Sequence, residues 1–218
     1  MLSKNQHLTR QMDLIPLEVL DTPINIIGAG AIGSFTALAL TKMGFNNLVV
    51  FDDDTIDVEN MNCQFFRFKD IGKSKVNALQ ELIEDFTNHK IEIIPTKWDN
   101  IPMEGITICA VDSMSVRKQV FERFYKQVND SKLIIDPRMG AETAMLFAYN
   151  PMSISEGNSY SKSLYSDDEA VQERCTAKST VYCALGLSSM ICTLVKNFVV
   201  DNKYKKQTLF DVTSFDMV

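Results

Sequence analysis

The chain has 218 residues, 45% of them hydrophobic, which is enough to bury a substantial core in one α/β domain. Its formal net charge is −6. An acidic chain is poorly suited to a nucleic-acid backbone, which calls for clustered Lys and Arg. The longest apolar run, 181–200, is interrupted by polar residues such as Lys196, so we expect no membrane span. Residues 1–21 lack the apolar centre of a signal peptide, and we expect a cytoplasmic protein.

The cysteines argue against a zinc site and against a disulfide framework. The chain has five cysteines at irregular spacing, two histidines and no Cys-x-x-Cys pair. A structural zinc site takes four Cys or His ligands, usually in paired motifs. Disulfide frameworks belong to small secreted domains. We therefore expect free thiols and no bound zinc.

The first half of the chain predicts alternating strands and helices. A strand at 24–27 precedes a glycine-rich turn and a helix at 34–43, with Gly44 placed to end it, and a second strand follows at 48–51. The next helix runs from 73 to 86. Its expected buried stripe is Val76, Leu79, Leu82, Ile83 and Phe86.

Strands at 91–94, 106–111 and 133–135 and a helix at 115–128 continue the alternation, which indicates a mostly parallel sheet. After Asp136 we expect a strand at 144–149, a long polar loop over 150–175 near the active site, a buried helix at 180–200 and a strand at 208–212. The predicted fold is an α/β Rossmann-like doubly wound sheet with C-terminal antiparallel strands. It forms a single domain over 1–218, with an N-terminal arm at 1–21.

A Gly-x-Gly-x-x-Gly turn is the main chemical signal. Gly28, Gly30 and Gly33 stand between the first strand and the first helix, where backbone N–H groups face an anion. Asp52 ends the second strand, and a carboxylate there accepts hydrogen bonds from ribose hydroxyls. The turn indicates a nucleotide site for NAD, FAD or ATP, with NAD the default for the motif alone.

The residues that follow favour ATP. Segment 50–64 carries an acid-rich strand end followed by Asn60 and Gln64, and resembles the ThiF and MoeB pattern of ubiquitin-activating enzymes. Gly72-x-x-Lys75 resembles the family's Gly-x-x-Lys, and 110–113 with Arg117 resembles its Cys-x-Asp-Asn segment. The N-terminal Arg10-Gln11 also fits in order. The resemblance covers nearly the whole chain, and its joint spacing is far more specific than the glycine turn.

The resemblance implies an enzyme that adenylates a carboxylate with ATP and Mg²⁺. Asp52 would hold the ribose at the acidic strand end that also carries Asp54. The residues implied around the phosphates are Asn60, Gln64 and Lys75. Asp112 would bind the metal, and Arg10 would reach the γ-phosphate from the other subunit of a dimer. Lys, Arg and Mg²⁺ suit this task because the triphosphate brings several negative charges.

One departure from the family pattern concerns an arginine. The family's Asn-Leu-x-Arg-Gln has Cys63 at the arginine position. Arg67, four residues later, is the candidate to replace it. The Cys-x-x-Cys zinc pairs of bacterial members are also missing, which bears on zinc and not on adenylation.

Cys175-Thr176 resembles the Cys-Thr of the eukaryotic branch, where the cysteine takes the activated protein as a thioester. An ordinary residue at a loop end is the alternative interpretation.

The implied substrate is the C-terminus of a ubiquitin-like protein or peptide, and the implied assembly is a homodimer, with a heterodimer left open. Two other functions stay open. One is a non-catalytic nucleotide-binding partner subunit, because of Cys63; the other is an NAD-dependent oxidoreductase, on the glycine turn alone.

Overall fold

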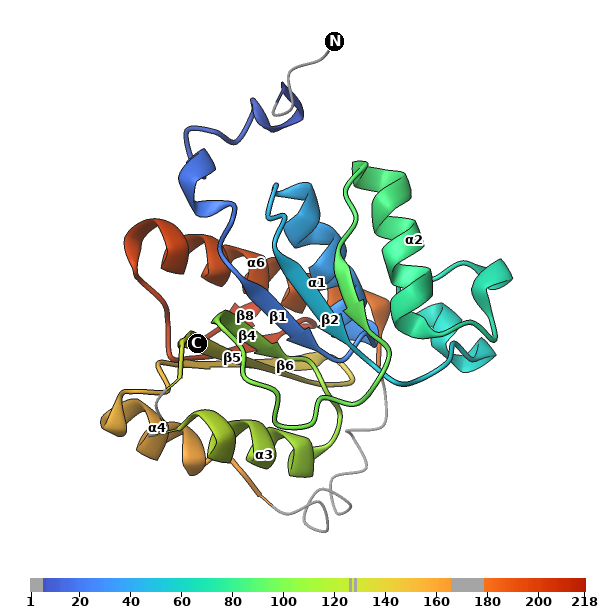
Figure 1. Ribbon diagram of the computed structural model, residues 1–218. Helices are drawn as coiled ribbons and strands as arrows, with labels where there is room; N and C mark the ends of the chain where they lie inside the picture. Colours follow the sequence, from blue (N-terminus) through green and yellow to red (C-terminus); the bar gives the residue numbers. More distant parts are fainter. Residues whose placement is uncertain (1–5, 126, 128, 166–178) are drawn as a thin grey trace.

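The computed structural model describes residues 6–125, 127, 129–165 and 179–218. Eight strands form one sheet in the order β3-β2-β1-β4-β5-β6-β7-β8 (Figure 1). The strands are β1 Ile24–Ile27, β2 Leu48–Phe51, β3 Glu92–Ile94, β4 Gly105–Cys109, β5 Ser131–Gly140, β6 Thr143–Tyr149, β7 Gln207–Asp211 and β8 Asp216–Met217. The helices are α1 Ala31–Lys42, α2 Lys75–Thr87, α3 Met114–Phe124, α4 Ile154–Ser161 and α6 Val181–Asp201.

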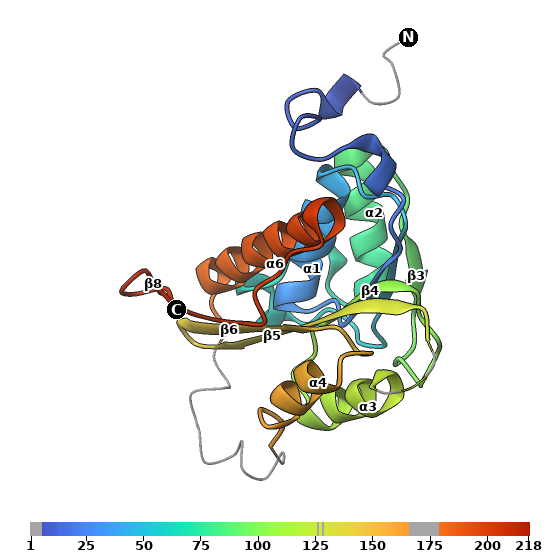
Figure 2. The ribbon, with the colours of Figure 1, turned by 90° about the vertical axis from the view of Figure 1, so that its left-hand side faces the viewer.

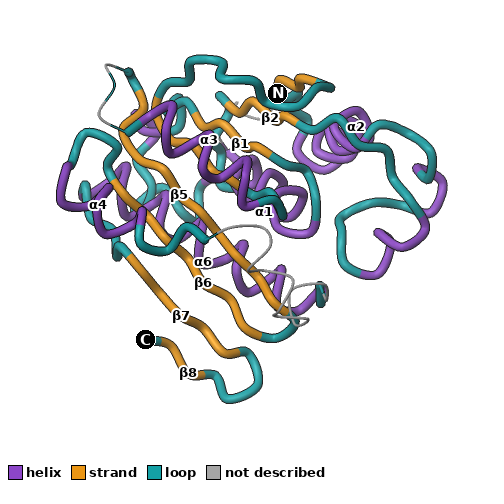
Figure 3. Tube along the Cα trace, turned by 90° about the horizontal axis from the view of Figure 1, so that it is seen from below, coloured by secondary structure: helices purple, strands orange, loops and turns teal. Residues whose placement is uncertain are grey.

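The sheet is parallel from β3 to β5 and antiparallel from β5 to β8. This confirms the Rossmann-like doubly wound fold with C-terminal antiparallel strands. The order reverses at β1, which pairs with β2 on one side and β4 on the other; seen from below, the strands follow one another across the sheet (Figure 3). In open α/β sheets, ligands bind at such a reversal, outside the carboxyl ends of the strands.

Helices cover both faces of the sheet. Helices α1, α2 and α6 lie on one face and α3 and α4 on the other (Figure 2). Alternate strand residues fill the two cores: Ile26 and Val50 pack with the first group, and Ile27 and Phe51 with the second. Because β1 and β4 are buried at every residue, their sequences are largely apolar runs.

Residues with left-handed backbone end the helices as expected. Gly44 follows α1 at φ +97°, and Asn88 and Asn202 cap α2 and α6 at φ 54° and 53°. Gly and Asn adopt this conformation most readily. Helix α1 begins three residues before the predicted start, because the glycine turn passes directly into its first turn.

Two expectations need correction. The segment 150–175 contains α4, which Ser153 caps by accepting a hydrogen bond from the Glu156 backbone at 3.4 Å. Only Gly157 and Tyr160 of α4 are buried, too few to give an apolar period. The rest of the predicted loop, 166–178, lies outside the described residues.

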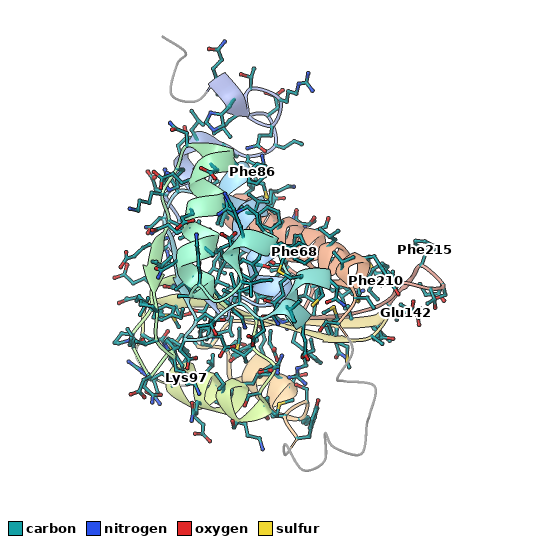
Figure 4. The ribbon with its side chains drawn as sticks, turned by 90° about the vertical axis from the view of Figure 1, so that its right-hand side faces the viewer. Phe68, Phe86, Lys97, Glu142, Phe210 and Phe215 are labelled. Carbon is teal, nitrogen blue, oxygen red and sulfur yellow. The ribbon has the colours of Figure 1, made fainter. Side chains whose placement is uncertain are left out.

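Phe86 does not join the buried stripe of α2. Its side chain is 55% exposed and lies at the surface (Figure 4), where the Lys42 ammonium stands 5.4 Å from the ring centroid. The other four residues of the stripe are buried.

Helix α6 is long and apolar enough to cross a membrane by length and composition alone, so its polar interruptions do not by themselves support the expectation of no span. The helix lies on the sheet beside α1, and Leu187, Ile191 and Val195 are core residues. Ser188 accepts a hydrogen bond from Thr36 of α1 at 3.1 Å. This packing is that of a core helix, and its buried Ser188 is hydrogen-bonded within the protein.

Candidate nucleotide-binding site

The glycine turn is built by close backbone packing. A Cβ on Gly28 would lie 2.4 Å from the Ala110 carbonyl oxygen, and a Cβ on Gly33 would lie 1.9 Å from the Gly28 carbonyl oxygen. Gly28 also has φ +98°. These two glycines are therefore required by the fold, since any side chain would collide with backbone. The turn joins the ends of β1 and β4 to the start of α1.

The N-terminus of α1 is open to a ligand. Gly30 is its N-cap residue, and no side chain caps the helix. A Cβ on Gly30 would meet only Gln64 Nε2, at 4.0 Å. The Gln64 Oε1 atom is buried and has no hydrogen-bond partner among the described residues. Uncapped helix N–H groups attract anions, and a buried unpaired amide oxygen is costly without a partner. The helix N–H groups fit the phosphates of a nucleotide, and the Gln64 oxygen, which accepts hydrogen bonds, fits a hydroxyl or amino group of the same ligand.

Asp52 lies beside the turn, where the sequence predicted it. Its Oδ2 accepts a hydrogen bond from the Ala29 backbone at 2.6 Å, and its Oδ1 accepts one from Asp54 at 2.9 Å. The carboxylate thus ties the end of β2 to the glycine turn. Each oxygen keeps a second lone pair, which is what binding a ribose hydroxyl requires.

Lys75 supplies a nearly buried cation. It begins α2, its side chain is 9% exposed, and its Nζ lies 2.7 Å from Asp54 Oδ2. The Asp54 side chain is 63% exposed. A buried ammonium needs such a partner, and a phosphate would serve as well as this exposed carboxylate.

A short helical turn at Val58–Asn62 carries the next predicted residues. The Asn60 side-chain oxygen accepts a hydrogen bond from the Asp57 backbone at 3.0 Å, so part of the hydrogen-bonding capacity of Asn60 is used to close this turn. Cys63 is buried, and burial raises the pKa of its thiol while Lys75 works in the opposite direction. The thiol is therefore neutral near pH 7, and the site lacks the positive charge that an arginine would bring here.

Arg67, the candidate to replace that arginine, is bound to acidic side chains in this structure. Its guanidinium contacts three carboxylates: Asp70 at 2.6 Å, Asp85 at 3.2 Å and Glu81 at 3.3 Å. A phosphate would have to compete with all three. Proximity to Cys63 in sequence suggested the role; in the structure Asp70 and two acids of α2 bind the side chain.

Asp112 stands on the loop after β4, at the same end of the sheet as Asp52. It is exposed. Val111, which precedes it, packs against the turn, with Cγ1 3.5 Å from a Cβ position on Gly28. The carboxylate oxygens of Asp52, Asp53 and Asp54 also lie within 4.8 Å of one another. Carboxylate oxygens are the ligands that Mg²⁺ prefers, so the donors at this end of the sheet fit the predicted metal.

Two predicted residues lie apart from this group. The N-terminal arm packs at the far end of α1, where the Gln11 side chain donates to the Met43 carbonyl and Leu8 lies against Gly44. The twelve residues of α1 span about 18 Å, so Arg10 is remote from the glycine turn of its own chain. Cys175 lies outside the described residues.

The structure also reveals a buried charged cluster that the sequence analysis did not predict. The fully buried Asp136 accepts hydrogen bonds from Arg117, Arg138 and Tyr160 at 2.7, 2.8 and 2.9 Å. Burial alone lowers the pKa of Arg117, and the Asp136 carboxylate raises it above its ordinary value. The sequence signal that could have indicated this cluster is Asp136 itself, an acidic residue directly after the apolar residues 133–135 of β5.

An open hollow of about 1190 Å³ lies at the opposite end of the sheet, near the starts of β4 and β5. Its charged groups engage one another: Glu156 accepts from Tyr204 at 2.7 Å and pairs with Lys206 at 3.1 Å. It lies away from the glycine turn, and its size alone does not make it the reaction site.

The chain is similar in sequence to curated activating enzymes. Over 107 residues the chain is 36% identical to the NEDD8-activating enzyme E1 catalytic subunit of Dictyostelium discoideum, covering 46% of this chain and 24% of the relative. Over 81 residues it is 48% identical to ubiquitin-like modifier-activating enzyme 5 of the same organism, covering 34% and 21%. The chain thus aligns with about a quarter or less of the length of these relatives.

Solved structures share the fold. The crystal structure of E. coli MccB with ATP superposes with a TM-score of 0.80 at 14% identity, over 99% of this chain and 71% of MccB. The crystal structure of PaaA gives 0.74 at 14% identity, over 99% and 72%. The sequence matches the ThiF family over residues 12–217. The chain therefore belongs to the ThiF family.

Proposed function

We propose that the chain binds ATP at the glycine turn and adenylates a carboxylate. The observation that carries the proposal is the joint placement of an uncapped helix N-terminus, the unpartnered Gln64 Oε1 and the buried Lys75 around one turn. Membership of the ThiF family and relatives named as activating enzymes support ATP over NAD.

The chain's own residues would hold the nucleotide and balance its charge. The Asp52 carboxylate orients the ribose, and the N–H groups at the start of α1 face the phosphates. Lys75 would exchange Asp54 for a phosphate oxygen, and Asp112 would hold Mg²⁺. The bound metal would neutralise charge on the phosphates.

The reaction needs positioning rather than a general base. A carboxylate is ionised near pH 7 and attacks the α-phosphorus directly. A new oxygen–phosphorus bond forms, the bond between the α-phosphorus and the bridging oxygen breaks, and pyrophosphate leaves with the electron pair. Orientation and charge stabilisation then supply the rate.

The proposed substrate is the C-terminus of a ubiquitin-like protein or a peptide. The relatives are named for ubiquitin-like modifiers, and MccB has been crystallised with MccA. We propose a homodimer acting in the cytoplasm, because Arg10 is remote from its own glycine turn and would complete the site of a partner.

Calorimetric titration with ATP·Mg²⁺ and separately with NAD tests the proposal. We expect wild-type protein to bind ATP and not NAD, and D112A to lose the part of the ATP affinity that depends on Mg²⁺. Binding of NAD without ATP would reject the proposal in favour of an oxidoreductase.

Cys175 is the proposed thioester acceptor after adenylation. The expected product is a covalent adduct with the activated protein that reducing agents release and that C175A does not form. Denaturing gel electrophoresis with and without reducing agent detects it. An adduct that persists in C175A would assign the acceptor elsewhere.

The second candidate function is a non-catalytic partner subunit, favoured by the neutral Cys63 where the family carries arginine. Pyrophosphate exchange by C63R separates the two. A large gain over wild type indicates a decayed site, whereas wild-type exchange that C63R does not improve shows that another residue already fills the role.

A further inference from the structure

The loop that carries Asp112 is held at both ends but not at its carboxylate. The Ala110 backbone donates to the Ile27 carbonyl at 2.8 Å, and the Ser113 side chain caps α3 by accepting from Val116 at 3.4 Å. Within the described part of the chain, no hydrogen bond or ion pair fixes the Asp112 carboxylate itself. Its position therefore follows from the backbone of residues 110–113.

Arg117 holds the middle of this loop. One of its terminal nitrogens donates to the carbonyl oxygen of Val111, directly before Asp112, and also to the Pro137 carbonyl at 3.2 Å. Its Nε donates to Asp136 Oδ1 at 2.7 Å. The guanidinium is planar, so the bond to Asp136 fixes the direction in which the nitrogen meets Val111.

Asp136 carries a second arginine that points elsewhere. Arg138 binds the other carboxylate oxygen at 2.8 Å through Nε and donates to the carbonyl and hydroxyl of Ser163 at 2.8 and 3.0 Å. Both arginines are nearly buried, at 5% and 9% exposure. They share one carboxylate, yet only Arg117 bonds to the loop of Asp112.

We propose that Arg117, oriented by the buried Asp136, is a positioning residue that sets the affinity of Asp112 for the divalent cation of the nucleotide complex. The inference rests on the proposed function, which makes Asp112 a metal ligand. Loss of a group that orients a metal ligand, without binding the metal itself, typically weakens metal affinity by about 10- to 100-fold. The buried cluster thus acts in metal binding as well as in packing α3 and α4.

The test compares R117K with R138K. Both variants keep the positive charge and lose the planar fork on Asp136, so melting followed by circular dichroism should show similar destabilisation. The measured quantity is the ratio of ATP affinity in Mg²⁺ to ATP affinity in EDTA, obtained by calorimetry. We expect R117K to lower this ratio by about 10- to 100-fold with the EDTA value unchanged, and R138K to keep the wild-type ratio.

V111G provides a second route that leaves the Asp136 cluster intact. It removes the contact with the glycine turn and loosens the backbone before Asp112. We expect it to lower the Mg²⁺ ratio as R117K does, and it keeps the proposal testable if R117K does not fold.

The outcomes separate this inference from the proposed function. Wild-type protein that gains no ATP affinity from Mg²⁺, or D112A that keeps the gain, rejects the proposed metal role and the inference with it. If wild type and D112A behave as proposed, an R117K ratio equal to that of R138K overturns the inference alone. With R117K unfolded, an unchanged ratio in V111G does the same.

Discussion

At the scale of single residues, the glycines of the turn have separate tasks. Gly33 has backbone 1.9 Å from where a Cβ would lie, whereas Gly30 has only the Gln64 side chain at 4.0 Å. Gly33 therefore serves the packing of strand against helix. The space at Gly30 lies in front of the uncapped helix and is available to a ligand.

This difference predicts that the same substitution affects stability at Gly33 and ATP binding at Gly30. G33A should lower the free energy of unfolding by at least about 1–3 kcal/mol, because the new methyl overlaps the Gly28 carbonyl. G30A should destabilise the protein less than G33A, because its methyl would meet no backbone atom within 4 Å, but it should weaken ATP binding, because the methyl fills ligand space. Urea denaturation and calorimetry measure the two effects. Wild-type ATP affinity in G30A would place the phosphates elsewhere.

At the scale of elements, an ion-pair network links the segment between β2 and α2 to helix α2. Asp70, which is fully buried, binds Arg67 at 2.6 Å and Lys73 at 3.2 Å, and both cations also reach Glu81 of α2. Hydrogen bonds from Arg67 hold the pKa of Asp70 below its ordinary value. The stability from this carboxylate is complete above the ordinary pKa of about 3.9 and is lost as the pH falls through the lower native value.

D70N should therefore destabilise the protein by about 1–3 kcal/mol at neutral pH, because it removes a charged acceptor from a buried site. The difference in free energy of unfolding between wild type and D70N should narrow as the pH falls below about 3.9, because the unfolded chain then takes up a proton at Asp70 that the native state, with its lowered pKa, still lacks. D85N is the matched control: Asp85 contacts the same arginine but is 69% exposed, so its loss should cost less than about 1 kcal/mol. Denaturation curves at neutral pH and below about pH 3.9 measure this difference. A difference that does not change with pH would show that charge is not the source of the effect.

The elements that could be predicted from sequence are those with strong local signals. The unit β1–α1–β2 follows from an apolar run, a glycine turn and Gly44, all of which act on the backbone where they stand. Helix α4 could not be predicted, because a short helix with two buried residues has no readable period. The sequence predicted α6 as a buried helix. Its length and hydropathy would also allow a membrane-spanning helix, so these two properties alone do not distinguish the two cases.

The site shows the same division. Asp52 and the glycines were predicted because each follows a strand whose end is clear in the sequence. The Asp136 cluster could not be predicted, since β5, α3 and α4 each contribute to it and only the tertiary fold brings them together. The ion pairs of Arg67 could not be predicted, because its proximity to Cys63 in sequence says nothing about Asp70 and the acids of α2 that bind it.

At the scale of the whole molecule, the N-terminal arm and the glycine turn lie at opposite ends of α1 (Figure 1). Leu8, Ile15 and Leu20 are buried core residues, so most of the arm is fixed to its own domain. Arg10 can therefore complete a site only if a second subunit brings its arm to the turn.

Mixing two inactive variants tests this arrangement. R10A and D112A should each lose adenylation, and their mixture should regain it, because a mixed two-fold dimer has one site free of both changes. Pyrophosphate exchange measures the recovery, and sedimentation gives the oligomeric state. A mixture as inactive as its components would mean that Arg10 acts within its own chain or not at all.

The strand order also sets the sequence of events during synthesis. β1 can pair with β2 early, but its other edge must wait for β4, where Ile24 meets Ile106. Helix α6 docks later still, joining Ser188 to Thr36. Until then the nascent chain exposes a bare edge of apolar β1 and an uncovered face of α1, and such surfaces invite aggregation. We therefore expect the yield of folded protein to rise when more chaperone is supplied during synthesis.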